Sequence, residues 1–178
     1  MELLLDRIES PIGALLAVCH GSTLCALEFS DYRDHMTNAL QARFGAFGLV
    51  ERTDPGGVCS RMHAYFSGAL DALAGLAVDG GGSDFQRLVW RGLRGISPGE
   101  VLTYAALAAR LGVPRAVRAV ARASALNPIN IVVPCHRVIG ADGSLRGYSG
   151  GLERKQWLLE HEGVRLRTRG PREPSFGG

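Results

Sequence analysis

Short apolar runs separated by turn residues make up the start of the chain. Residues 3–8, 14–18 and 24–29 are mainly apolar, and the stretches 10–13 (Ser-Pro-Ile-Gly) and 20–22 (His-Gly-Ser) separate them. Runs of this length between glycine- and proline-containing segments are typical of strands joined by tight turns. The pattern therefore predicts a three-stranded meander with antiparallel neighbours.

The apolar spacing then becomes helical. Residues 36–44 and 58–66 carry apolar side chains at intervals of three and four, which is the spacing of one helix face. A glycine-rich stretch follows over 75–82 and ends in consecutive glycines, a composition typical of linkers. We expect an N-terminal domain over 1–79 built from the sheet and these helices.

The second half opens with a signal for the start of a helix. Ser83, followed three residues later by Gln86, matches a capping box. Thr103 is placed to cap a helix over 104–111, and a glycine and a proline then turn the chain into another helix over 115–126. Two short helices joined through a glycine-containing turn resemble a helix-turn-helix.

A β-branched run reappears near the end of the chain. Ile131-Val132-Val133 is typical of a buried strand, which would deliver Cys135 at its end. A final helix is expected over 151–161. The pattern predicts the α/β (α+β) class, with a small antiparallel sheet domain followed by a mainly helical domain over 83–164 that carries the helix-turn-helix. A basic, proline- and glycine-rich tail over 165–178 completes the chain.

Composition narrows the class of protein. The 178 residues are 46% hydrophobic and 21% charged, as in soluble globular proteins. Apolar runs are shorter than the roughly 20 residues of a membrane span, and the first residues lack the pattern of a secretory signal. The four cysteines are too sparse for a disulfide framework and fit a reducing compartment. We therefore expect a cytoplasmic protein that is not bound to membranes.

Charge is distributed unevenly behind a net charge of +3. Residues 1–84 hold 5 Arg/Lys against 11 Asp/Glu, a balance of −6, whereas residues 85–178 hold 15 against 6, a balance of +9. A basic half beside an acidic half favours a polyanion as the partner of the basic half. A solvated arginine-rich surface would give the same count.

The best candidates for catalytic residues lie in the segment Pro134-Cys135-His136-Arg137-Val138. A thiol flanked by histidine and arginine lies in the electropositive setting that lowers a thiol pKa and produces a thiolate nucleophile. Neighbouring residues on a strand point to opposite faces, however, and a buried cysteine is usually inert. The pair alone supports either reading. If Cys135 is a nucleophile, we expect it to titrate below a free thiol.

The wider sequence favours the nucleophile. Residues 127–140 (Asn-Pro-Ile-Asn-Ile-Val-Val-Pro-Cys-His-Arg-Val-Ile-Gly), with 147–152 and 157–163, resemble the active-site region of the 6-O-alkylguanine-DNA alkyltransferases. These are also called methylated-DNA–protein-cysteine methyltransferases. The similarity extends over 85–163 without a large insertion, and the first half of the chain matches only loosely.

This resemblance implies DNA repair by an irreversible, single-turnover transfer. After base flipping, an alkyl group would move from 6-O-alkylguanine in duplex DNA to Cys135, with 4-O-alkylthymine as a further candidate substrate. His136 would take the thiol proton through a water, and Glu162 would orient His136. Asn127 would support the thiol and its turn, and Tyr104 would hydrogen-bond the flipped base. Taken alone, the last three have bland readings: a helix-end charge, a helix-terminal residue and a surface aromatic.

The resemblance also implies positions that contact DNA and the alkylated base. Arg115, Arg118 and Arg122 recur at i, i+3 and i+7, on one face of the predicted second helix. Arg118 matches a family side chain that enters the duplex as the nucleotide leaves it. A solvated arginine stripe is the alternative. The expected substrate- and DNA-binding residues are Arg118, Arg115, Arg122, Thr103, Val138, Tyr148 and Ser149.

Two departures from the family fall on the same helix. Ala121 and Ser124 stand where relatives commonly carry glycine and asparagine, and neither change removes a catalytic group. The resemblance implies no cofactor. Its implied partner is double-stranded DNA containing alkylated guanine, and we expect a monomer, with cooperative binding along DNA left open.

Other functions share some of these features. A DNA-binding regulator of this type would carry a zinc–cysteine domain ahead of the unit, a lesion-flagging relative would lack Cys135, and a Cys-His hydrolase would need an oxyanion hole. A structural zinc is also weakly supported, and we expect none, because the candidate ligands lack a tight two-plus-two spacing. These candidates are Cys19, His20, Cys25, Cys59 and His63.

Overall fold

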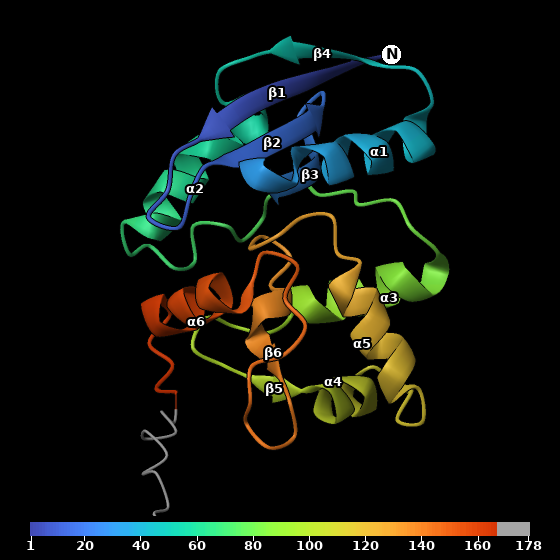
Figure 1. Ribbon diagram of the computed structural model, residues 1–178, viewed down its shortest axis with the longest axis vertical. Helices are drawn as coiled ribbons and strands as arrows, with labels where there is room; N and C mark the ends of the chain where they lie inside the picture. Colours follow the sequence, from blue (N-terminus) through green and yellow to red (C-terminus); the bar gives the residue numbers. More distant parts are fainter. Residues whose placement is uncertain (167–178) are drawn as a thin grey trace, which may run out of the picture.

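The computed structural model describes residues 1–166 and shows a sheet half and a helical half stacked along the long axis (Figure 1). In the sheet half the strand order is β3-β2-β1-β4. The elements are β1 (Glu2–Ile8), β2 (Leu15–His20), β3 (Thr23–Phe29), η1 (Ser30–Tyr32), α1 (Arg33–Phe44), β4 (Gly48–Glu51), η2 (Pro55–Gly57) and α2 (Val58–Phe66). The predicted antiparallel meander and both predicted helices are confirmed. Strand β4 was missed. It pairs parallel to β1 at the sheet edge, and it is short and mostly exposed, so its pattern is weak.

The sheet is buried on both faces, which explains the nearly continuous apolar run of β2. Because successive strand residues point to opposite faces, Leu16 and Val18 pack toward Met36 and Leu40 of α1. The other face belongs to a larger cluster shared with α2 and the helical half. Its sheet members include Ile8, Leu15, Ala17, Cys19, Leu24, Leu27 and Phe29. One continuous core therefore joins the two halves.

The helical half contains the predicted helix pair. Its elements are α3 (Asp84–Arg94), β5 (Leu102–Thr103), α4 (Tyr104–Arg110), α5 (Val117–Ala125), η3 (Cys135–Arg137), β6 (Val138–Ile139) and α6 (Leu152–His161). The Ser83–Gln86 capping box at the start of α3 is present, and the Thr103 hydroxyl caps α4 by accepting from the Ala106 amide at 3.0 Å. The small parallel pair β5–β6 was not predicted, because two-residue strands carry no readable pattern.

The strand predicted at Ile131-Val132-Val133 is wrong. These residues form a tight turn, in which the Val133 amide donates to the Ile129 carbonyl at 3.0 Å. Ile131 has a φ of 70°, a left-handed conformation that costs a β-branched residue about 1–3 kcal/mol. The side chain of Asn127 holds the turn, since it accepts from the Ile129 amide at 2.9 Å and donates to the Val133 carbonyl at 2.7 Å. Periodicity reports burial here, but side-chain hydrogen bonds decide the backbone path.

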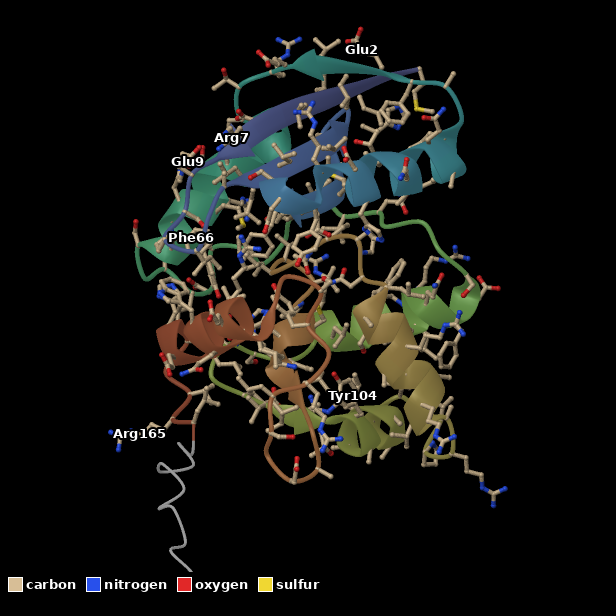
Figure 2. All side chains as sticks on the ribbon, in the orientation of Figure 1. Glu2, Arg7, Glu9, Phe66, Tyr104 and Arg165 are labelled. Carbon is tan, nitrogen blue, oxygen red and sulfur yellow. The ribbon has the colours of Figure 1, made fainter. Side chains whose placement is uncertain are left out.

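Several contacts fasten the halves together. The Leu27 amide of β3 donates to the Pro128 carbonyl, and the Leu24 amide donates to Ala77 in the segment predicted as a linker. Phe66 lies at the junction (Figure 2), where its ring packs against Trp157 and His161 of α6.

No helix within residues 1–166 is long and apolar enough to cross a bilayer. The predicted tail lies beyond the described residues, apart from its first two.

Candidate active site

Cys135 begins η3, directly after the turn that Asn127 holds. Its side chain is buried, with 7% of the residue exposed. The Asn127 amide nitrogen, which also holds the turn, donates to the Cys135 sulfur at 3.3 Å. The same amide therefore shapes the backbone and places the thiol, and the supporting position predicted for Asn127 is the one observed.

The pKa of the Cys135 thiol is shifted in the opposite direction to the one predicted. Burial raises the pKa of the Cys135 thiol, while the Asn127 hydrogen bond and the charge of Lys155 oppose that rise. The prediction of a thiol that titrates below a free cysteine is therefore wrong for this state. The enclosed setting penalises the thiolate more than the Asn127 hydrogen bond and the Lys155 charge stabilise it. His136 and Arg137 are neighbours in the sequence, and both side chains bind the same carboxylate.

That carboxylate is Glu162, at the C-terminal end of α6. One of its oxygens contacts His136 Nε2 at 2.8 Å, Arg137 Nη2 at 2.8 Å and the Tyr65 hydroxyl at 2.7 Å. Its other oxygen accepts from Arg137 Nε at 2.9 Å. The predicted pairing of Glu162 with His136 is present. Arg137 and Tyr65 were missed as partners, although a glutamate at a helix C-terminus is unfavourable unless something neutralises it.

The charges of this cluster follow from its contacts. Burial alone would raise the pKa of Glu162, but the hydrogen bonds from His136 and Arg137 lower it to about 2, so it is ionised. Burial lowers the pKa of His136, against the opposing pull of Glu162. A neutral imidazole that donates from Nε2 to the carboxylate keeps a lone pair on Nδ1. Among the described residues Nδ1 has no hydrogen-bond partner although it is buried.

Lys155 is a second buried charge that sequence reasoning missed. It is fully buried, and its ammonium donates to the Val138 and Arg146 carbonyls, each at 2.6 Å. Burial lowers its pKa to about 8. The sequence did carry a signal for the burial of Lys155. It lies three and four residues before the apolar Leu158 and Leu159, a spacing that puts all three on the same face of α6.

The predicted base-binding residues differ in burial and in their contacts. Val138 is fully buried in β6, and the Tyr148 ring packs edge-on against His136, with centroids 6.4 Å apart. The Ser149 hydroxyl lies 3.4 Å from the side-chain oxygen of Asn130, a residue that was not predicted. Tyr104, in the helical half (Figure 2), donates to the Arg146 carbonyl at 3.4 Å. Burial raises the pKa of Tyr104, and the Cys135 charge adds to this rise.

The arginines predicted to bind DNA lie on or just before α5. Arg118 and Arg122 are exposed on this helix, while Arg115 is exposed in the turn before it, because α5 begins at Val117 and not at 115 as predicted. No ion pair joins any of the three to another residue within 1–166. Their charge is therefore available to an external anion.

The candidate zinc ligands all lie in the sheet half. Residues 1–166 contain no group of three or more His, Cys, Asp or Glu side chains arranged to hold a metal ion. Cys19 donates to the Pro55 carbonyl, and Cys59 donates to Asp6 at 3.0 Å. Both thiols are thus hydrogen-bond donors to residues of the sheet half.

Fold and site together define a helix-turn-helix protein that carries a buried thiol beside a histidine–glutamate pair. Comparison with known families agrees over nearly the whole chain. The ribonuclease-like domain of 6-O-methylguanine DNA methyltransferase matches residues 4–79, and the DNA binding domain of 6-O-methylguanine DNA methyltransferase matches residues 84–164.

Individual relatives are similar over more than nine-tenths of their length. The methylated-DNA–protein-cysteine methyltransferase of Salmonella typhimurium is 47% identical over 169 residues, which cover 93% of this chain and 99% of the relative. The crystal structure of Mycobacterium tuberculosis O6-methylguanine methyltransferase has a TM-score of 0.72 at 37% identity and covers 96% of both chains. The structure of Mycobacterium tuberculosis OGT in complex with DNA has a TM-score of 0.73 at 40% identity, covering 91% of this chain and 92% of that one. The chain belongs to the 6-O-methylguanine DNA methyltransferase family.

Proposed function

We propose that this protein repairs duplex DNA by moving a methyl or larger alkyl group from guanine O6 to the sulfur of its own Cys135. One observation carries the proposal. The Cys135 sulfur lies in the half matched by the DNA binding domain, where a side-chain amide donates to it. The other three cysteines belong to the sheet half. The relatives named methylated-DNA–protein-cysteine methyltransferase support the same chemistry.

The transfer is a displacement at an sp³ carbon. The Cys135 thiol loses its proton, the sulfur forms a bond to the alkyl carbon, and the bond between that carbon and guanine O6 breaks with its electron pair on the base. His136 is the proposed base for the thiol proton, because Nε2 is held by Glu162 and Nδ1 retains a lone pair. We propose that a water carries the proton between them. The lowered pKa of His136 favours the neutral form that a base requires.

The leaving base needs its own stabilisation. Tyr104 is the proposed donor to the leaving base, because its raised pKa keeps the hydroxyl protonated and able to donate as negative charge develops. Val138, Tyr148 and Ser149 are the proposed walls of the pocket. The product is a thioether, which has no easy hydrolytic route back to the thiol. Each protein molecule would therefore act once, as catalyst and as acceptor.

Access to a base inside a duplex requires extrusion of the nucleotide, which costs a few kcal/mol. Arg118, exposed on α5, is the proposed side chain that fills the vacated space. Arg115 and Arg122 are proposed phosphate contacts, and Thr103 positions Tyr104 by capping α4. We propose a monomer as the acting unit, bound to double-stranded DNA that contains alkylated guanine.

Mass spectrometry of the intact protein tests the proposal. After incubation with duplex DNA containing 6-O-methylguanine, the wild type is expected to gain one methyl group per chain, located on the Cys135 peptide. Cys135→Ser is expected to gain none and to keep its DNA affinity, because phosphate contacts supply most of it. Cys25→Ser, which removes another buried thiol, serves as the matched control and should still be methylated. Methylation of the Cys135→Ser protein would refute the assignment.

A further inference from the structure

A second chain of hydrogen bonds reaches the Cys135 sulfur, and it begins in the sheet half. Glu28 of β3 is buried, with 5% exposed. One of its carboxylate oxygens accepts from the Asn130 side-chain nitrogen at 2.8 Å and from the Phe29 amide at 3.0 Å. Asn130 is fully buried, and its side-chain oxygen lies 4.0 Å from the Cys135 sulfur.

The chemistry of these groups fixes how the Asn130 amide points. An ionised carboxylate can only accept hydrogen bonds, so the amide must present its NH₂ group to Glu28. Its oxygen is then turned toward Cys135, where it can accept the thiol hydrogen. The sulfur accepts from Asn127 on another side. This arrangement satisfies a neutral thiol, whereas a thiolate would face the amide oxygen directly.

We propose that Glu28 is a positioning residue that, through the orientation of the Asn130 amide, holds the Cys135 thiol in its protonated form. The inference rests on the proposed role of Cys135 as the acceptor. It gives the sheet half a direct part in the chemistry of the helical half. Both links of the chain run between side chains more than nine-tenths buried, so solvent does not replace them easily.

The surroundings of Glu28 make this control sensitive to pH. Burial raises the pKa of Glu28 to about 7, and Asp31 adds to the rise, while Arg154 opposes it. His35 and Arg43 line a cavity of about 440 Å³ that Glu28 also borders. A protonated Glu28 can donate to the amide oxygen of Asn130. The amide can then turn its NH₂ group toward the sulfur, which favours the thiolate.

The ionisation of Glu28 and that of Cys135 are therefore opposed. As pH rises through about 7, Glu28 gains the negative charge that keeps the thiol protonated, so thiolate formation is spread over a wide pH range. Removing the charge should move the thiol titration to lower pH, with Lys155 left as the coupled group. A residue that only supports the fold would not produce this change.

The test is the rate at which iodoacetamide alkylates the Cys135 peptide between about pH 6 and pH 10, read by mass spectrometry. Glu28→Gln keeps the shape of the side chain and removes its charge, and it is expected to lower the apparent thiol pKa by about one unit. Asn130→Asp adds a charge beside the sulfur and is expected to raise it. Glu51→Gln, on the exposed edge strand β4, is the matched control and should leave the profile unchanged.

Opposite shifts from the two buried variants would support the proposal. An unchanged or raised thiol pKa in Glu28→Gln, or a lowered one in Asn130→Asp, would overturn it. Thermal unfolding of each variant, measured alongside, identifies any that is misfolded at the temperature of the titration. The small reagent reports the thiol pKa without any methyl transfer. Failure of this proposal is thus distinguishable from failure of Cys135 as the acceptor, which the methylation experiment tests separately.

Discussion

At the scale of single residues, Glu162 shows how a charge can be kept inside the molecule. Its carboxylate is neutralised by Arg137 and held by neutral donors from His136 and Tyr65. Removing one member of a buried ion pair leaves its partner charged and without compensation, which commonly costs 3–5 kcal/mol. The cluster therefore orients His136, and the loss of either charged member would leave the other buried without compensation.

We predict that Glu162→Gln lowers the free energy of unfolding at pH 7 by about 3–5 kcal/mol, because Arg137 stays buried without its counter-ion. The pKa of Glu162 is lowered to about 2 in the folded protein, against roughly 4.3 when unfolded. Its contribution is thus fully present above the unfolded value and is lost as pH falls toward about 2. Denaturant unfolding at a series of pH values should show the wild type and Glu162→Gln converging in acid.

The matched control for this prediction is Glu160→Gln, an exposed glutamate in the last turn of α6. Its unfolding free energy is expected to stay within about 0.5 kcal/mol of the wild type at every pH. A difference between Glu162→Gln and the wild type that stayed constant down to acid pH would show that lost packing, not lost charge, destabilises the variant.

At the scale of elements, helix α5 has a buried face that packs into the core and an exposed face that carries arginines. Its inner face packs Val120 and Ala123 into the core, and the Ala123 carbonyl accepts from the Trp90 indole at 2.8 Å. Its outer face presents Arg118 and Arg122. An arginine on the outer face can therefore be replaced without disturbing the packing of α5 against α3.

We predict that Arg118→Ala slows repair of duplex DNA by at least about tenfold more than it slows repair of the free alkylated base, since only the duplex requires extrusion. The measurement is the single-turnover rate with each substrate. Arg33→Ala, an exposed arginine on α1, is the control and should change neither rate. Equal slowing with both substrates would make Arg118 a pocket or packing residue instead.

Arg115 and Arg122 should behave differently from Arg118. Each is proposed to contact one phosphate, so its replacement by alanine is expected to weaken DNA binding at every sequence. The slope of log affinity against log salt should become shallower by about 0.9, the value for one lost contact on duplex DNA. A slope that stays unchanged in both variants would remove them from the DNA interface.

The sequence predicted elements with a regular period well and missed those decided by single hydrogen bonds. The meander, α1, α2 and the capped helices α3 and α4 follow from apolar spacing and cap residues. The turn at Ile131 does not, because Asn127 overrides a β-branched run that would favour a strand. The resemblance identified Cys135, His136 and Glu162, whereas no pattern reports that Glu28, distant in sequence, lies against Asn130.

At the scale of the whole molecule, the sheet half holds the active site from two sides. Tyr65 of α2 donates to Glu162, and Glu28 of β3 accepts from Asn130. A third contact is made by Arg154, whose guanidinium lies 4.0 Å from the centre of the Phe29 ring and pairs with Asp31. The sheet half is therefore a support for catalytic geometry as well as a cover for the shared core.

We predict that Tyr65→Phe destabilises the protein by about 1.5–3 kcal/mol, because it removes a hydrogen bond to a buried charge and changes little else. The transfer rate should fall as well, since Glu162 loses one of the contacts that hold it against His136. Denaturant unfolding and single-turnover kinetics provide the two measurements. Tyr32→Phe, an exposed tyrosine, is the control. A stability equal to the wild type would show that the hydrogen bond from Tyr65 to Glu162 makes no net contribution to folding.

The uneven charge of the chain acquires a direction once the halves are seen end to end along the long axis (Figure 1). Residues 1–84 carry −6 and the described residues 85–166 carry +7, from 12 Arg/Lys against 5 Asp/Glu, so this part of the molecule is an electric dipole. The field of a nearby polyanion exerts a torque on such a dipole before the surfaces meet. We therefore expect the helical end to turn toward the DNA and the sheet end away from it, which would shorten the rotational search in each collision.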